Sequence, residues 1–192
     1  MRIVAGRHRG RRLHALTGDR IRPTSDRARE SLFNVLAHNP LGPGSRSTFE
    51  GARVLDAFAG TGALGLEALS RGAAFATFME RERAALAVLE ENIRALGEGA
   101  RARVLRADAL APPPAPEPAS LAFLDPPYGR GLAEPALAAL AKARWFADEA
   151  LVIIELSKAD ALAPPPGFRT LEERSYGQTR FTLLRWSPSA DG

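Results

Sequence analysis

The sequence predicts an α/β protein built on a doubly wound, mostly parallel sheet of seven strands with an antiparallel last strand. From residue 52 onward, short apolar runs typical of buried strands alternate with segments of helical periodicity. The chain then ends in two β-rich segments around Tyr176-Gly177-Gln178, which indicates a hairpin. A length of 192 residues with 45% hydrophobic residues suits one domain with a full core and a short extension.

The extension is expected to be a basic arm over residues 1–48. Gly6 and Gly10 serve as turn points in residues 2–14, which are expected to form a short, exposed β-hairpin. Apolar residues at helical spacing predict a helix over 26–38, with a capping residue at 24–26. The Gly- and Ser-containing stretch 42–47 then marks a boundary, so the second domain is placed at 49–192.

The body supplies the remaining elements of the expected fold. Strands are expected at 53–58, 75–80, 102–106, 121–125, 151–156, 169–174 and 180–186. Helices are expected at 63–71, 82–96 and 133–144. The proline-rich stretches 112–118 and 164–166 are interpreted as surface loops.

The net charge of +4 is unevenly distributed along the chain. Residues 1–30 carry nine Arg against three acids, a net charge of +6, whereas residues 31–192 carry 17 basic and 19 acidic side chains. Arginine binds phosphate bidentately and stacks on bases, so this clustering indicates a nucleic-acid partner. The composition, with 24 Arg and 2 Lys, explains the residue type but not the clustering. The expected contacts are Arg7, Arg9, Arg11 and Arg12.

Composition also excludes several classes of site. There is no Cys, which rules out disulfides, thiolate zinc sites and a cysteine nucleophile. His8, His14 and His38 lack the spacing of metal ligands, so no metal is expected. No apolar run approaches about 18 residues, and the N-terminal apolar run is too short for a signal peptide. A cytoplasmic protein with no membrane association is therefore expected.

A strand, a glycine loop and a helix predict the first candidate site. Gly60, Gly62 and Gly65 match the pattern G-x-G-x-x-G, so a nicotinamide dinucleotide and an oxidoreductase stay open as an alternative. Asp56 disfavours that alternative, because its carboxylate would lie close to a pyrophosphate. A cationic ligand removes the conflict: S-adenosylmethionine carries a sulfonium and an ammonium, and Glu80 at the end of the next strand could accept its ribose hydroxyls.

Asp125-Pro126-Pro127-Tyr128, after the fourth strand, predicts the second candidate site. In a doubly wound sheet the ends of the first and fourth strands face one crevice. The carboxylate of Asp125 and the backbone carbonyl of Pro126 can accept both N–H groups of an exocyclic amine and direct its lone pair at a methyl group. The ring of Tyr128 can stack on the base. The expected catalytic residues are Asp125, Pro126 and Tyr128.

Both sites together resemble amino-methyltransferases that carry a D/N-P-P-aromatic motif and act on adenine N6, cytosine N4 or guanine N2. The segments 1–13 and 21–36, with the signature R-P-T-x-D-R-x-R-E-x-L-F-N, resemble the opening of the bacterial RsmD family. With 54–72, Asp108, 125–129 and 176–185, this resemblance covers nearly the whole chain.

The resemblance implies a Rossmann-like class I methyltransferase fold and S-adenosylmethionine as the methyl donor. It implies transfer to the N2 amino group of one guanine in 16S rRNA of the small ribosomal subunit. Separately, the protein is expected to be a monomer. It adds Arg22 and Thr24 to the expected RNA contacts. The implied donor-binding residues are Asp56, Phe58, Gly60, Thr61, Gly62, Glu80, Asp108 and Ala109. An enzyme acting on adenine N6 and a non-catalytic RNA-binding module remain alternatives.

Overall fold

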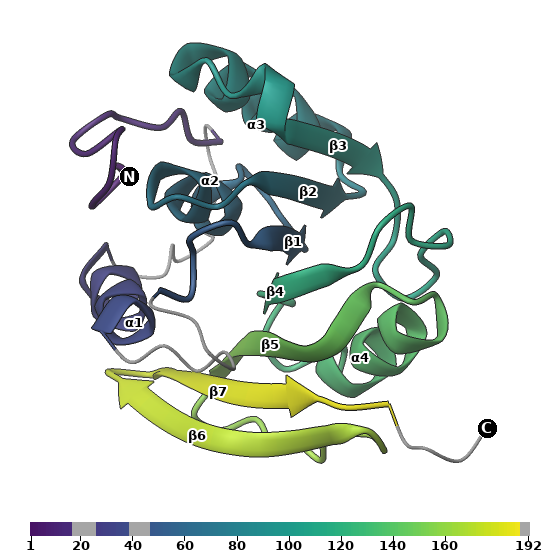
Figure 1. Ribbon diagram of the computed structural model, residues 1–192. Helices are drawn as coiled ribbons and strands as arrows, with labels where there is room; N and C mark the ends of the chain where they lie inside the picture. The colour runs from purple at the N-terminus through teal and green to yellow at the C-terminus, as the bar shows by residue number, and fades with distance from the viewer. Residues whose placement is uncertain (17–25, 39–46, 189–192) are drawn as a thin grey trace.

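A single seven-stranded sheet runs through the centre of the protein (Figure 1). The computed structural model describes residues 1–16, 26–38 and 47–188. The strands are β1 (Arg53–Ala57), β2 (Phe75–Glu80), β3 (Ala102–Arg106), β4 (Ala119–Leu124), β5 (Phe146–Ser157), β6 (Phe168–Tyr176) and β7 (Thr179–Trp186). Their order is β3-β2-β1-β4-β5-β7-β6. Strands β1 to β5 are parallel and β7 is antiparallel to both of its neighbours, so the expected topology is confirmed.

Helices cover both faces of this sheet. They are α1 (Asp26–His38), α2 (Ala63–Ser70), α3 (Arg83–Leu96) and α4 (Ala133–Lys142), with a 3-10 turn at Gly99–Arg101. Side chains alternate between the faces, as the strand geometry requires. Val54 belongs to a buried cluster with residues of α1, α2 and α3, whereas its neighbour Leu55 belongs to a second cluster with residues of α4. The result is a three-layer α/β/α domain.

The sheet order places the site. The chain moves outward from β1 through β2 to β3, then returns to β4 on the other side of β1. Such a reversal leaves a crevice at the carboxyl ends of the two central strands, because their following loops turn in opposite directions. Both candidate motifs follow these two strands, so the fold brings them together.

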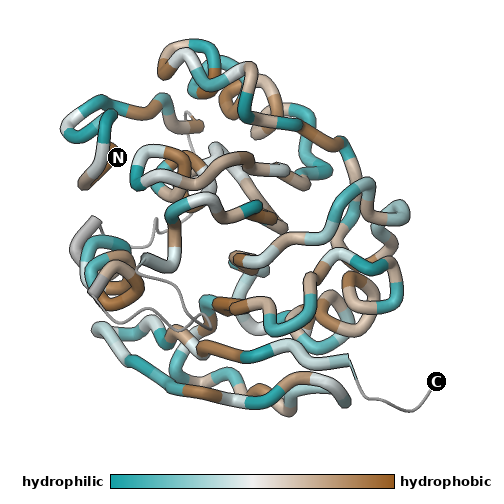
Figure 2. The backbone as a smooth tube through the Cα atoms, viewed as in Figure 1, coloured by the Kyte–Doolittle hydropathy of each residue, from teal (hydrophilic) through white to brown (hydrophobic). Residues whose placement is uncertain are grey.

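The arm forms the short hairpin that the sequence predicts, but two of its side chains are buried. A single antiparallel bridge joins Arg2 to Arg12, and the amide of Ile3 donates to the carbonyl of Arg11. Ile3 is 1% exposed and Leu13 is 6% exposed, because both pack into the cluster beneath α1, α2 and α3. Figure 2 shows hydrophobic residues interrupting the hydrophilic arm. The predicted hairpin is therefore present and exposed over most of its length, but these two residues anchor it in the core.

The arm also docks through polar contacts with buried partners. The carboxylate of Glu67, which is fully buried, accepts hydrogen bonds from the amides of Val4 (2.7 Å) and Ala5 (3.0 Å). At Gly6 the backbone passes so close to α2 that a Cβ atom would lie 1.9 Å from the carbonyl oxygen of Ser70. Only glycine fits there, and its φ of +80° suits glycine as well. The arm thus lies against α2 and α3 (Figure 1).

Strand β5 is longer than expected. The sequence predicts 151–156, whereas the strand runs from Phe146 to Ser157. Its first half contains two exposed acids, Asp148 and Glu149, and Glu149 has a φ of +58° beside a register shift in the pairing with β4. These acids interrupt the apolar pattern from which the sequence predicts the strand. Within the described ranges, no helix is long and apolar enough to cross a membrane.

Candidate functional site

Three carboxyl groups lie together on one face of the sheet. Strand β4 lies between β1 and β5, and its register places Leu124 beside Ile154. The residues that follow these two are Asp125 and Glu155, and Asp56 lies near the end of β1. The residue two positions before each acid belongs to the cluster under α1, α2 and α3. Because side chains alternate, all three acids point to that same face.

Asp56 is held at the base of the glycine loop. It is 1% exposed, and its Oδ2 accepts a hydrogen bond from the amide of Gly65 at 2.8 Å. Burial raises the pKa of Asp56 to about 8; the bond from Gly65 lowers it, and the charge of Glu80 raises it further. The carboxylate therefore needs a positive charge nearby in order to ionise at neutral pH.

The loop itself combines positive backbone angles with close packing. Gly60 has a φ of +53° and open space where a Cβ atom would be, so a ligand can approach its backbone. Gly62 has a φ of +86°, and a Cβ atom there would lie 2.4 Å from Leu89 of α3. Phe58 adopts a φ of +64°, which is strained for a side chain of this size. This strain sits where β1 turns into the loop.

Glu80 and Asp108 are both engaged by neighbouring groups. Glu80 accepts bonds from the amides of Gly60 (2.7 Å), Arg81 (2.7 Å) and Glu82 (2.8 Å). Asp108 accepts one from Leu110 at 2.9 Å and pairs with Arg81 at 3.1 Å.

Three carboxylate lone-pair directions of Glu80 are thus occupied, and the glycine loop is fixed to the end of β2. Ala109 is 3% exposed, with its methyl group in the core.

The loop after β4 presents an aromatic ring to solvent. Pro126 is buried and Pro127 is exposed. Tyr128 is 43% exposed, yet its hydroxyl donates a hydrogen bond to Oε1 of Glu155 at 2.6 Å. Burial and this bond raise the pKa of Tyr128 above its ordinary value. Burial also raises the pKa of Asp125 well above its ordinary value, and the charges of Glu155 and Asp56 add to the effect.

Glu155 is the site residue that sequence reasoning did not single out. Its side chain is 2% exposed and accepts the hydrogen bond from Tyr128. The available signal was an acid within an otherwise apolar strand, which predicts burial with a specific partner.

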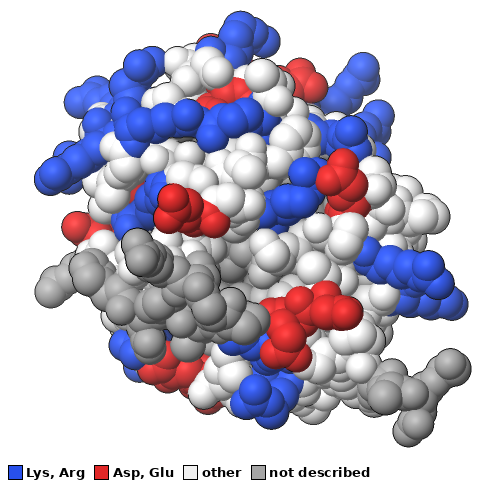
Figure 3. Space-filling view, viewed as in Figure 1, with Lys and Arg blue, Asp and Glu red and all other residues white. Residues whose placement is uncertain are grey.

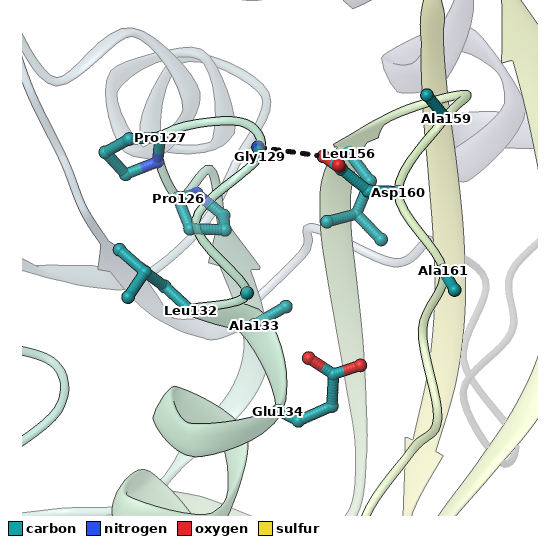
Figure 4. A pocket seen from close by; sticks show the side chains of 11 residues that line it. Pro126, Pro127, Gly129, Leu132, Ala133, Glu134, Leu156, Ala159, Asp160 and Ala161 are labelled. Atoms are coloured by element: carbon teal, nitrogen blue, oxygen red, sulfur yellow. Dashed lines mark hydrogen bonds between the residues drawn. The ribbon is translucent and has the colours of Figure 1, made fainter.

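A cavity of about 250 Å³ adjoins the loop after β4 (Figure 4). Pro126, Pro127 and Leu132 line one side, and the segment after β5 lines the other. Asp160, in that segment, accepts a bond from the amide of Gly129 at 3.2 Å. This contact ties the motif loop to the β5–β6 connection.

The predicted RNA contacts of the arm divide into two groups. Arg7 pairs with the buried Glu98 at 2.5 Å, and Arg11 donates to the carbonyl of Ala95 at 2.7 Å. Within the described part of the chain Arg9 and Arg12 make no such contact, and all four arginines are exposed, including Arg7 at 47%. Figure 3 shows basic side chains gathered where the arm and α3 lie in Figure 1. The predicted contacts at positions 22 and 24 lie outside the described residues.

The residues present fit S-adenosylmethionine. Among the ion pairs of the described residues, none involves Asp56 or Asp125, so a cationic ligand would supply the missing charge. The open backbone at Gly60 leaves room for such a ligand beside Asp56. A pyrophosphate is itself negative, so it would not supply the positive charge that Asp56 needs in order to ionise. Within the described ranges, no three His, Asp or Glu side chains form a group suited to a metal ion.

Sequence comparison decides the family. The family model described as "Conserved hypothetical protein 95" matches residues 1–185. Ribosomal RNA small subunit methyltransferase D of Escherichia coli K12 is 40% identical over 187 residues, covering 96% of this chain and 89% of that protein. The protein of the same name from Haemophilus influenzae is 35% identical and covers 96% and 93%. The chain belongs to this family, and the resemblance to the RsmD family is confirmed.

Solved structures agree with this assignment. A putative methyltransferase from E. coli superposes with a TM-score of 0.82 at 39% identity, covering 97% of this chain and 98% of that one. A putative RNA methyltransferase from Pyrococcus horikoshii, at 19% identity and a TM-score of 0.69, shares the fold. The predicted class I methyltransferase fold is therefore confirmed.

Proposed function

We propose that this protein transfers a methyl group from S-adenosylmethionine to the exocyclic N2 amino group of a guanine in 16S rRNA of the small ribosomal subunit. One observation carries the proposal. The glycine loop after β1, with Asp56 at its base, lies beside the loop after β4 that contains Asp125-Pro126-Pro127-Tyr128. The family relatives named as small-subunit rRNA methyltransferases support the RNA substrate.

The donor side of the site is formed by the loop after β1. S-adenosylmethionine supplies an electrophilic methyl group on a sulfonium. The carboxylate of Asp56 ionises beside that positive charge and holds it. Glu80 reaches the ribose hydroxyls by exchanging its bonds to the amides of Arg81 or Glu82. Asp108 and the backbone of Ala109 lie beyond β3, where they contact the adenine.

The acceptor side uses two hydrogen-bond acceptors on a stiff loop. The N2 nitrogen of guanine is a weak nucleophile, because its lone pair is delocalised into the ring. The carboxylate of Asp125 and the carbonyl of Pro126 accept its two N–H groups and turn the lone pair toward the methyl carbon. Two consecutive prolines limit the motion of these acceptors. Most of the acceleration then comes from holding nitrogen, carbon and sulfur in line.

Tyr128 and Glu155 complete the acceptor side. The exposed tyrosine ring offers a face on which the base stacks, worth about 1–3 kcal/mol. The hydrogen bond from the Tyr128 hydroxyl to Glu155 holds the ring in place, so the ring is already positioned when the base binds. After methyl transfer the nitrogen is cationic and strongly acidic. The raised pKa of Asp125 makes its carboxylate a ready acceptor for that proton.

The test is methylation of small-subunit particles from cells that lack the modification, with isotopically labelled donor. Mass spectrometry of the nucleosides should find N2-methylguanosine with wild-type protein and none with Asp125→Ala. Asp148→Ala is the matched control, because Asp148 is an exposed acid at the opposite end of β5, and it should act like wild type. N6-methyladenosine would instead identify an adenine enzyme. Binding of a nicotinamide dinucleotide in place of the donor would refute the methyltransferase assignment.

A further inference from the structure

A buried asparagine on α3 connects the N-terminal arm to the glycine loop. Asn92 is fully buried on the apolar face of α3, which Leu89 and Leu96 also form. An amide buried among leucines and isoleucines must have its hydrogen bonds satisfied, because each unmade bond costs about 1–3 kcal/mol. Its partners belong to two segments that are far apart in sequence.

The first partner is the arm. Oδ1 of Asn92 accepts a hydrogen bond from the amide of His14 at 2.7 Å, and Nδ2 donates to the carbonyl of His14 at 3.1 Å. The side-chain amide of Asn92 thus bonds to both the N–H and the C=O of His14, as the backbone of a neighbouring β-strand would. Leu13, just before it, is buried in the core.

The second partner is the donor loop. Nδ2 of Asn92 also donates to the carbonyl of Thr61 at 3.0 Å. The amide at the other end of the same peptide unit, that of Gly62, donates to the carbonyl of Ala59 at 2.7 Å. The peptide plane between Thr61 and Gly62 is therefore fixed at both ends. Gly62 also packs directly on Leu89, one turn before Asn92, so the loop rests on the same face of α3.

We propose that Asn92 is a positioning residue through which the docked arm holds the donor loop in its binding conformation. This rests on the proposed function in taking S-adenosylmethionine as the ligand of the loop. Linkage is reciprocal, so a donor that requires the ordered loop also strengthens the docking of the arm at His14. The arm that carries the RNA-binding arginines is in this way coupled to the donor site.

Asn92→Asp is the sharpest perturbation. It is nearly isosteric and still accepts from the amide of His14, but it loses both donated bonds and places an oxygen against the carbonyls of His14 and Thr61. Loss of the bond to Thr61 together with that repulsion should weaken donor binding about tenfold. Glu98→Gln is the matched control. Glu98 is 2% exposed and anchors Arg7 and His8 of the arm near α3, without touching the loop.

Donor affinity is measured by titration calorimetry with S-adenosylmethionine, at a temperature where thermal melting shows each variant folded. Asn92→Asp is expected to lose about tenfold. Glu98→Gln, which loosens the arm at Arg7 and His8 but leaves Asn92 bonded to Thr61, is expected to lose less. Unchanged affinity in Asn92→Asp, or a loss in Glu98→Gln as large as in Asn92→Asp, would overturn the proposal. A wild-type protein that fails to bind the donor would instead overturn the proposed function.

A second measurement needs no variant. Hydrogen exchange of the His14 amide in wild-type protein is followed with and without the donor. The proposal expects slower exchange at His14 when the donor is bound, although His14 lies in the arm and not in the loop. Unchanged exchange in the presence of saturating donor would refute the coupling, even if Asn92→Asp does not fold.

Discussion

Replacing Asp56 by Asn should make the protein more stable while abolishing donor binding. The amide resembles the protonated carboxyl in shape, and its oxygen can still accept the hydrogen bond from Gly65. The substitution to Asn removes the free-energy cost of burying a carboxyl group whose negative charge has no positive partner. The same change removes the negative charge proposed to hold the sulfonium.

The size of the gain follows from the pKa. Burial raises the pKa of Asp56 from 3.8 to about 8. Because the folded value exceeds the unfolded one, stability is greatest below pH 3.8 and falls until the pH passes about 8. Each pH unit in this window costs about 1.4 kcal/mol. Asp56→Asn should thus gain roughly 2 kcal/mol at pH 5 and about 4 kcal/mol at pH 7, which is roughly 10 °C in melting temperature.

Urea unfolding and thermal melting at pH 5, 7 and 8.5 measure the difference, and calorimetry measures donor binding. Asp108→Asn is the control for stability, because the Asp108 side chain is 36% exposed and already pairs with Arg81. It should show no gain that grows with pH. A variant Asp56→Asn that is less stable than wild type at pH 7, or whose gain is the same at every pH, would refute the reasoning.

Three further changes test other parts of the site. Gly62→Ala should lower donor affinity at least tenfold by calorimetry, because its methyl group would lie 2.4 Å from an α3 leucine at a φ of +86°. Glu155→Gln should move the acid limb of the pH–rate profile to lower pH, because burial and the Glu155 charge raise the pKa of Asp125. Changing both Arg9 and Arg12 to Ser should reduce the salt slope of RNA binding by about 0.7–0.9 per lost phosphate contact, with donor affinity unchanged.

Each of these has a contrary outcome. Full donor affinity in Gly62→Ala would mean that the loop does not need its close packing on α3. An acid limb that stays in place in Glu155→Gln would mean that Asp125 does not set it. An unchanged salt slope in the double arginine variant would place the RNA on another surface.

The sheet and its order could be predicted because each strand carries its own local signal. The apolar runs at 53–58 and 75–80 and the helical spacing at 82–96 are readable without knowing their partners. The two motifs were located by their glycines and prolines, whose backbone limits are local as well. In doubly wound sheets the carboxyl ends of the central strands face one crevice, so the two motifs could be predicted to lie together.

The contacts of the arm could not be predicted in the same way. Val4 and Glu67 are 63 residues apart, and Arg7 and Glu98 are 91 residues apart. Pairing between buried polar groups at such separations leaves no periodic trace in one sequence. For Glu155 the sequence signals burial, but its partner Tyr128 lies 27 residues away in the loop after β4 and leaves no such signal. Asn92, an amide within an apolar helix face, did offer a local signal.

The docking of the arm has a consequence for synthesis on the ribosome. The arm is made first, yet its anchors on α2 and just after α3 come 62 to 91 residues later. At about 5–20 residues per second, an interval on the order of 5–20 s separates the arm from its last anchor. Throughout that time Ile3 and Leu13 have no core to enter, and Arg7 lacks its partner Glu98. The newborn chain therefore exposes a basic and partly apolar arm before the helices on which the arm docks have been made.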